Sequence, residues 1–247
     1  MSGHSKWATI RRKKEATDGA RAKVFTKIGR EIAVVVKEGG ADPNNNAKLR
    51  ELIAKAKSNN VPNDNIDRII KKAAGDADKT NYESNVYEGY GPCGVAVIVE
   101  TLTDNKNRTA GDIRHYFDKY GGNLGTSGCV SFMFTRQGTI VLDYTGQDED
   151  KVMEDVFEAG ASDFNIEGEI IEVICEPNDV SSVAESFRGM GYNVISAEDE
   201  QVPSTYTALT DEDAIRKMRL LLDALDENDD VQNVYHNWDM PEEPDED

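Results

Sequence analysis

A nested series of strands and helices constrains the fold of this chain more than any other sequence feature. Between residues 138 and 201 the hydrophobic pattern predicts the order β-α-β-β-α-β. That order is typical of a ferredoxin-like domain. The predicted elements are residues 139–144, 148–159, 164–167, 170–175, 180–190 and 193–197.

The segments on either side of this series predict the two parts of another domain. Residues 94–101 form a strand, 108–120 a helix and 129–135 a strand with Val130, Phe132 and Phe134 on one face. Residues 205–209, 211–225 and 231–237 then form a strand, a helix and a strand. Because insertion is tolerated at an exposed turn, we predict a split α/β domain of residues 84–136 and 203–238 with an acidic ferredoxin-like domain, 138–201, inserted in it.

Residues 1–78 are predicted to form a basic arm and a small helical domain. Asp42 and Pro43 predict the start of a second helix that ends at Asn59 and Asn60. A third helix follows Pro62 and ends near Gly75. The first helix, residues 20–38, has apolar side chains at helical spacing and cations opposite them: Phe25, Ile28, Ile32, Val35 and Val36 on one face, and Lys23, Lys27 and Arg30 on the other.

Three segments without hydrophobic periodicity lie between or after these domains. Residues 76–85 have no hydrophobic period and predict a linker, and residues 89–94 predict a Gly-Pro turn that leads into the next strand. Residues 239–247 contain six acids and two prolines and predict a disordered acidic tail. The fold class that we predict is therefore α+β, with an N-terminal helical domain followed by two ferredoxin-like α/β domains, one inserted in the other.

Charge is distributed unevenly along the chain. The whole sequence has a formal net charge of −19, yet residues 1–30 hold nine Lys and Arg against two acids, a local charge of +7. Such a segment is typical of a protein that neutralises a polyanion at one end. Trp7 can stack on a base or pack on the helical domain. We expect these residues to bind nucleic acid: Lys6, Trp7, Arg11, Arg12, Lys13, Lys14, Arg21, Lys23, Lys27 and Arg30.

Two further segments leave their interpretation open. The helices on either side of residues 59–65 predict either a helix-turn-helix or an ordinary helical hairpin. In a helix-turn-helix, the side chains available to a groove of the nucleic acid would be Asn63, Asn65, Arg68, Lys71 and Lys72. The inserted domain has the topology of RNA-recognition modules, but it carries two cations against 17 acids and lacks their aromatic-basic signature. We therefore expect it to contact protein, or to orient the chain on a polyanion by repulsion.

The sequence predicts no catalytic residue and no enzyme. The Gly-rich stretch 121–128 lacks the Lys-Ser/Thr ending of a phosphate-binding loop, so we interpret it as a helix end and a turn. Asp226, Asn228 and Asp230 have the first spacings of a calcium loop. Val231 stands where that loop needs glycine, and Asn237 where it needs glutamate, so the loop fails.

Cofactors, metals and membranes are not expected either. Cys93, Cys129 and Cys175 are odd in number and lie far apart in the sequence, which predicts reduced thiols of a cytosolic protein. The three histidines are isolated, so no cluster of metal ligands is predicted. No apolar run approaches the roughly 18 to 20 residues that cross a bilayer. We expect a cytoplasmic protein with no metal, no cofactor, no small-molecule substrate and no membrane partner.

Several longer motifs resemble one known family. They are Ser2-Gly-His-Ser-Lys-Trp7, Arg12-Lys-Lys14, Phe25-Thr-Lys27, Tyr87-Glu-Gly-Tyr-Gly-Pro92, Asp104-Asn-Lys-Asn-Arg-Thr109, Gly121-Gly-Asn-Leu-Gly125 and Val231-Gln-Asn-Val-Tyr-His-Asn237. In order and spacing they resemble the YebC family, which includes bacterial probable transcriptional regulators and the mitochondrial translational activator of cytochrome c oxidase subunit I. The resemblance implies a three-domain cytoplasmic protein that binds nucleic acid and regulates gene expression without being an enzyme.

Two functions remain open at this point. The first is a DNA-binding transcriptional regulator, and the second is a translation factor that binds ribosomal RNA and associates with the ribosome. Phosphate contacts do not separate them, because such contacts carry no base information. A third alternative, a scaffold without nucleic acid, requires the arm to bind an acidic protein.

Overall fold

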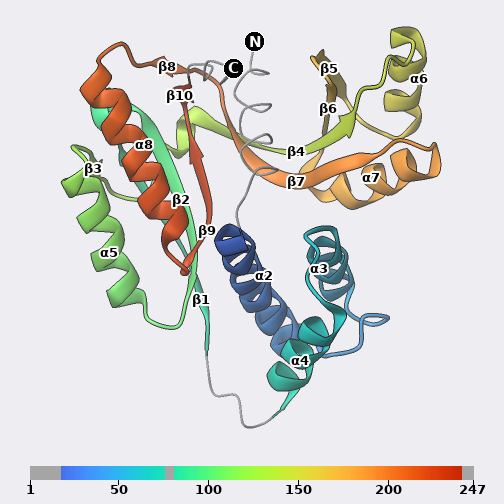
Figure 1. The fold of residues 1–247 in the computed structure, drawn as a ribbon, viewed down its shortest axis with the longest axis horizontal. Coiled ribbons are helices and arrows are strands. Elements are labelled where there is room, and N and C mark those ends of the chain that lie inside the picture. Colours follow the sequence, from blue (N-terminus) through green and yellow to red (C-terminus); the bar gives the residue numbers. More distant parts are fainter. Residues whose placement is uncertain (1–17, 76–80, 241–247) are drawn as a thin grey trace. The chain divides into compact units, whose positions relative to one another are not determined.

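The structure, a computed structural model, describes residues 18–75 and 81–240 (Figure 1). The predictions for the basic arm up to residue 17, for linker residues 76–80 and for tail residues 241–247 lie outside the described residues. The described chain confirms the predicted fold class, with a helical amino-terminal region followed by sheet-containing α/β parts. It divides into two compact units, and the helical region belongs with the first sheet in one of them.

Three helices form the helical region: α2 (Asp18–Gly39), α3 (Ala47–Ser58) and α4 (Asn63–Ala74). The apolar stripe of α2 packs against both other helices, and Ile32 and Leu49 are fully enclosed. Asn59 caps α3 and Gly75 caps α4, as the sequence predicts. The remaining buried members of this core are Ile28, Ala33, Val36, Ala56, Val61, Ile66 and Ala73.

The predicted start of the second helix is wrong. Its N-cap is Asn46, whose side-chain oxygen accepts the backbone N–H of Leu49 at 3.1 Å. The carboxylate of Asp42 instead accepts hydrogen bonds from Asn44 and Asn45, so residues 42–45 form a turn. Three consecutive asparagines each offer a capping oxygen, and spacing alone does not select among them.

The first sheet has the order β3-β1-β2-β9 and is antiparallel throughout. Its strands are β1 (Glu83–Tyr90), β2 (Ala96–Thr103), β3 (Asn123–Leu124) and β9 (Val231–His236). Helix α5 (Lys106–Lys119) follows β2, and α8 (Glu212–Glu227) precedes β9. The two helices contact each other and cover one face of the sheet (Figure 1).

Two predictions for this sheet are wrong. Strand β1 begins in residues that we assigned to a linker and ends in residues that we assigned to a turn, because its sequence is polar and contains Gly89. The predicted strand 129–135 does not form: residues 131–133 are a 3-10 turn, and the next strand begins at Phe134. Gly128 has φ +88°, and its amide, with those of Val130 and Ser131, is bound by the carboxylate of Glu88. Those amides are therefore not available to a strand ladder.

The second sheet has the order β5-β6-β4-β7, also antiparallel, which is the ferredoxin-like arrangement. Its elements are β4 (Phe134–Asp143), α6 (Glu149–Glu158), β5 (Asp163–Glu167), β6 (Ile170–Cys175), α7 (Val180–Gly189) and β7 (Val194–Pro203). The predicted strand 170–175 has the bounds that the structure shows. Strands β4 and β7 are longer than predicted, because they pair with each other from Phe134 opposite Pro203 onward.

A parallel pair of two-residue strands completes the described chain. Strand β8 (Thr207–Ala208) pairs with β10 (Trp238–Asp239), and the side chain of Trp238 is fully buried. The predicted strand 205–209 is thus reduced to two residues. Asp239, which we placed in a disordered tail, lies in β10.

Candidate nucleic-acid interface

Only part of the predicted nucleic-acid interface lies within the described residues. Lys6, Trp7, Arg11, Arg12, Lys13 and Lys14 lie outside them. Arg21, Lys23, Lys27 and Arg30 belong to α2, and side chains are described from Ala22 onward. The described side chains of Lys23, Lys27 and Arg30 are only partly exposed, since α2 lies among other elements of its unit.

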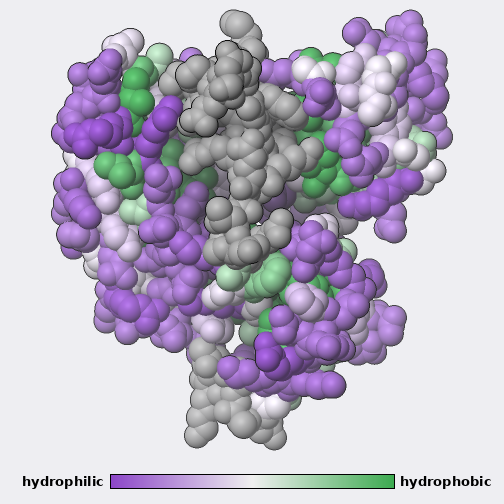
Figure 2. Space-filling model, viewed as in Figure 1, coloured by the Kyte–Doolittle hydropathy of each residue, from purple (hydrophilic) through white to green (hydrophobic). Residues whose placement is uncertain are grey.

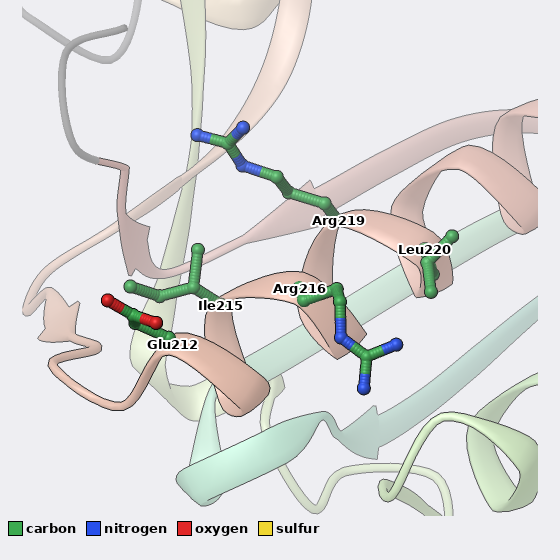
Figure 3. A pocket seen from close by; sticks show the side chains of 5 residues that line it. All are labelled: Glu212, Ile215, Arg216, Arg219 and Leu220. Carbon is green, nitrogen blue, oxygen red and sulfur yellow. The ribbon is translucent and has the colours of Figure 1, made fainter.

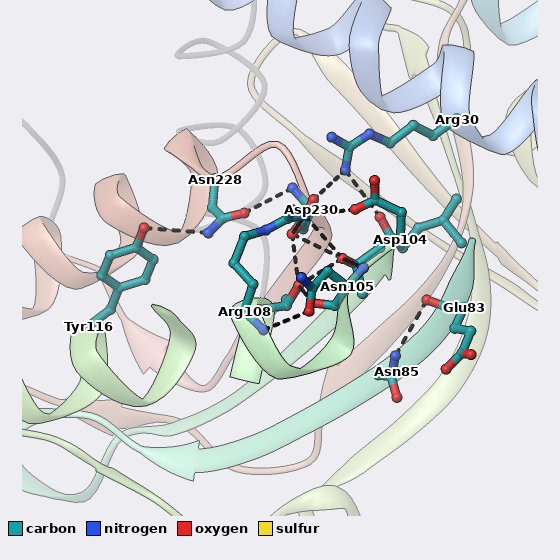
Figure 4. A network of polar contacts seen from close by, with 12 residues as sticks. Arg30, Glu83, Asn85, Asp104, Asn105, Arg108, Tyr116, Asn228 and Asp230 are labelled. Carbon is teal, nitrogen blue, oxygen red and sulfur yellow. Dashed lines mark hydrogen bonds and ion pairs between the residues drawn. The ribbon is translucent and has the colours of Figure 1, made fainter. Parts of the chain in front are cut away.

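Arg30 is directed at a carboxylate of the first sheet domain. Its Nη1 lies 2.6 Å from Oδ1 of Asp230 and 3.2 Å from the carbonyl oxygen of Leu102 (Figure 4). The guanidinium also lies over the ring of Tyr82, 5.6 Å from its centroid. The arginine side chain is 17% exposed and that of Asp230 is 5% exposed, so this ion pair is largely shielded from water.

Asp230 is the centre of a hydrogen-bond network that joins three elements (Figure 4). Its Oδ2 lies 2.8 Å from Nη2 of Arg108, 3.1 Å from the hydroxyl of Thr103 and 2.7 Å from that of Thr109. Burial of Asp230 favours its neutral form, but hydrogen bonds from Arg108, Thr109, Arg30 and Thr103 outweigh burial and lower its pKa to about 2. The carboxylate is therefore charged under physiological conditions.

The other described cations of α2 also have partners. The Nζ of Lys23 lies 3.4 Å from Oε1 of Glu227, at the end of α8, and the side chains are 38% and 74% exposed. Lys27 also has an interaction partner within the protein. Sequence periodicity placed these cations on one face of α2, but it contained no signal for Glu227 or Asp230, which lie about 200 residues away.

Helices α3 and α4 carry further exposed cations. Arg68, Lys71 and Lys72 are exposed on α4, and Nη2 of Arg68 donates to the side-chain oxygen of Asn65 at 3.0 Å. Figure 2 shows that hydrophilic side chains dominate the visible surface over α3 and α4. The structure supplies the two helices that a helix-turn-helix needs, and it supplies them equally for a simple hairpin, so both interpretations of residues 59–65 stay open.

The Gly-rich stretch is held by Glu88 of β1. This side chain is buried, and it accepts backbone N–H groups of Gly128, Val130 and Ser131 at 2.7, 2.9 and 2.8 Å. Burial opposes its ionisation, but these three hydrogen bonds prevail and lower the pKa of Glu88 below its ordinary value. Within the stretch, the amide of Gly128 thus binds the Glu88 carboxylate and that of Gly125 binds the backbone carbonyl oxygen of Glu88, so neither is free to bind a phosphate.

Helix α8 carries a pocket of about 310 Å³ on its outer side (Figure 3). It is lined by Glu212, Ile215, Arg216, Arg219 and Leu220, and Arg216 is bonded to Asp213. These five side chains come from one helix and include no nucleophile beside a base. The pocket therefore offers no catalytic arrangement of the kind that hydrolases need.

Residues 18–75 and 81–240 contain no group of three or more His, Cys, Asp or Glu side chains placed to hold a metal ion. In those ranges no helix combines the length and the apolar character that a bilayer crossing requires. Cys93, Cys129 and Cys175 are free thiols.

Fold and charge together define a class: a multidomain α+β protein that has a helical amino-terminal region with a strongly basic end, and two antiparallel α/β sheets. Comparison with known proteins gives the family. Residues 5–76 match the family described as TACO1/YebC protein N-terminal domain, and residues 82–238 match TACO1/YebC second and third domain. The chain belongs to the TACO1/YebC family, which confirms the resemblance.

Relatives match over nearly the whole chain. A probable transcriptional regulatory protein from Acetivibrio thermocellus is 58% identical over 239 residues, covering 96% of this chain and 99% of that protein. A second one, from Caldicellulosiruptor bescii, is 56% identical over 244 residues, with 98% and 100% coverage. The crystal structure of a conserved hypothetical protein from Aquifex aeolicus is 40% identical, with a TM-score of 0.81 and coverage of 93% and 95%.

Proposed function

We propose that this chain is a nucleic-acid-binding regulator of gene expression that acts as a DNA-binding transcriptional regulator. The observation that carries the proposal is the local charge of +7 in residues 1–30 of a protein whose net charge is −19. Such a segment attracts phosphate, while the acidic remainder resists nonspecific association. Relatives named probable transcriptional regulatory proteins support the same function.

In this proposal the cations position the chain and do not select a sequence. Phosphate contacts fix orientation but carry no base information. Trp7 adds base stacking. We further propose that the protein is cytoplasmic, is not an enzyme, and uses no cofactor and no small-molecule substrate. The proposed contacts are Lys6, Trp7, Arg11, Arg12, Lys13, Lys14, Arg21, Lys23, Lys27 and Arg30.

A second function is favoured by a different observation. The resemblance extends to a mitochondrial translational activator, and both family descriptions name TACO1 beside YebC. In this alternative the arm binds ribosomal RNA, and the acidic inserted domain, with 17 acids and two cations, faces protein. Backbone phosphates of RNA and DNA offer the same acceptors, so the cations of the arm suit both targets.

Charge reversal of the arm separates the functions. The variant carries Arg11, Arg12, Lys13 and Lys14 changed to Glu, and the matched control carries the same change at four exposed cations elsewhere, Lys106, Arg114, Lys119 and Arg188. Both are compared with the unchanged chain by DNA binding at physiological salt and by sedimentation of cell extract with and without RNase.

Each outcome has a separate meaning. If the unchanged chain and the control bind a DNA duplex specifically, the arm variant does not, and no protein sediments with ribosomes, the result supports transcription. If the unchanged chain and the control sediment with ribosomes and the arm variant does not, the result supports translation. About five phosphate contacts on a DNA duplex predict a slope of about −4.5 for log affinity against log salt. A slope near zero, or equal binding by all three proteins, would refute nucleic-acid binding by the arm.

A further inference from the structure

The turn that joins α8 to β9 presents two carboxylates to α2. Glu227 lies 3.4 Å from Lys23, and Asp230 lies 2.6 Å from Arg30. Lys23 and Arg30 are seven residues apart, two helical turns, so they share one face of α2. Residues 227–230, which we call the acidic turn, therefore bind two of the cations that the proposed function assigns to phosphate.

The network around Asp230 is divided between its two oxygens. Oδ1 accepts from Arg30, whereas Oδ2 is bonded to Arg108, Thr103 and Thr109 of the sheet domain. If Arg30 leaves, Oδ2 keeps its three donors, and Arg108 still supplies a positive charge. Release of Arg30 thus avoids the large cost of leaving a buried carboxylate without a counter-ion.

Carboxylate and phosphate compete for the same guanidinium. Both are anionic acceptors that match the fork of an arginine side chain. A nucleic-acid backbone presents many such anions, whereas the acidic turn offers one to each cation. Phosphate therefore has the chemistry to take the place of Asp230 and Glu227 at α2.

We infer that the acidic turn is an internal competitor that holds Arg30 and Lys23 until nucleic-acid phosphate displaces it. This inference rests on the proposed function and describes its regulation. Binding of nucleic acid then frees α2 from the end of α8, so any change that strengthens the internal ion pairs weakens nucleic-acid binding by the same free energy.

The test removes the competing charge and compares it with a neighbour. Asp230→Asn keeps the shape of the side chain, and its amide N–H₂ faces Arg30 once the amide oxygen takes the bonds of Oδ2. Two donors then meet, so Arg30 loses its counter-ion and keeps the weaker contacts with the carbonyl oxygen of Leu102 and the ring of Tyr82. Asp229→Asn is the matched control, because Asp229 is exposed, lies in the same turn and changes the net charge equally. Glu227→Gln frees Lys23 at an exposed site, where misfolding is not expected.

Binding is measured by fluorescence anisotropy on a short DNA duplex and on the RNA duplex of the same sequence, between about 50 and 200 mM salt. Asp230→Asn is expected to bind about threefold more tightly or better than Asp229→Asn, which corresponds to roughly 0.7 kcal/mol. Its salt slope on DNA should be more negative by about 0.9, the contribution of one added phosphate contact. Adding Arg30→Gln should abolish the gain, and Glu227→Gln should show a smaller gain of the same sign.

The competing explanation is that Asp230 only positions α2. In that case Asp230→Asn binds as Asp229→Asn does, or more weakly, with an unchanged slope, and the inference is overturned. If Asp230→Asn loses its circular dichroism spectrum, Glu227→Gln decides: binding equal to Asp229→Asn overturns the inference. If the unchanged chain binds neither duplex, the proposed function fails and the inference fails with it.

Discussion

At the scale of single residues, Asp230 links the stability of the fold to pH. Its folded pKa of about 2 lies below the value of about 3.9 expected in the unfolded chain. Because the folded pKa is the lower one, the charged carboxylate stabilises the fold above about pH 4, and this contribution disappears as pH falls through 2. A shift of this size corresponds to about 2.5 kcal/mol at neutral pH.

Urea denaturation between pH 7 and pH 2.5 tests this coupling. We expect Asp230→Asn to be less stable than the unchanged chain at pH 7 and to lose less stability on acidification, because it has no carboxyl group at 230 to protonate. Asp229→Asn should follow the unchanged chain at every pH. Parallel curves for Asp230→Asn and the unchanged chain would show that Asp230 does not couple folding to pH.

Glu88 gives a second prediction at this scale. In Glu88→Gln an N–H₂ group replaces one acceptor oxygen, so at least one of the amides of Gly128, Val130 and Ser131 loses its partner in a buried place. The free energy of unfolding should fall by about 2 kcal/mol at pH 7. Glu83→Gln, at an exposed position of the same strand, should change it by less than about 0.5 kcal/mol. Equal stability of the two variants in urea would contradict the role of Glu88.

The candidate interface shows what sequence reasoning can and cannot supply about single residues. Helical periodicity placed Lys23, Lys27 and Arg30 together on one face of α2, because their spacing is local. Asp230 is 200 residues from Arg30, and no local pattern pairs them. In the sequence, Asp230 attracts attention only as part of a calcium loop that lacks its glycine and glutamate. Only the structure shows that this acid binds Arg30.

At the scale of elements, hydrophobic period predicts the strands and helices that bury a continuous apolar face. Strand β6 is apolar at every position except Glu172 and was predicted with its observed bounds. Strand β1 was missed because it buries Glu88 and Gly89, residues that are typical of turns. What places β1 in the sheet is long-range: pairing with β2 on one side and with β3 on the other.

Gly89 is the position where this long-range packing can be tested. A Cβ there would lie 2.6 Å from the carbonyl oxygen of Asn123 and 2.8 Å from Cε1 of Phe117, and the first is backbone that cannot turn aside. Gly89→Ala should therefore destabilise the chain by about 1 to 3 kcal/mol in thermal or urea unfolding.

Gly111 supplies the matched control for that substitution. It lies inside α5 with open space around its Cα, so Gly111→Ala should stabilise the chain by about 0.5 to 1 kcal/mol through helix propensity. Opposite signs for the two substitutions support the close approach of β1 and β3. A Gly89→Ala protein as stable as the unchanged chain would show that the strands separate more easily than the structure indicates.

At the scale of the whole molecule, the second sheet has a hydrophobic core of its own. The core of the second sheet includes the fully buried Ile140, Val156, Ile171 and Phe187, and its described members all fall between residues 140 and 197. A core drawn from one continuous segment favours independent folding. We propose on this ground that the inserted domain, placed by the sequence at residues 138–201, folds without the remainder of the chain.

Two fragments test this proposal and its boundaries. Residues 132–205 contain all of β4 and β7, whereas residues 138–201 lack the outer pairs from Phe134 opposite Pro203 to Gln137 opposite Glu200. We expect the longer fragment to unfold in one cooperative urea transition with a stability of about 3 to 5 kcal/mol, and to give a dispersed amide NMR spectrum. The shorter fragment should be less stable, because it loses ladder hydrogen bonds and the ion pair of Arg136 with Asp199. Collapsed, poorly dispersed spectra from both would mean that the second sheet depends on the split domain around it, and that the insertion is a feature of topology without independent stability.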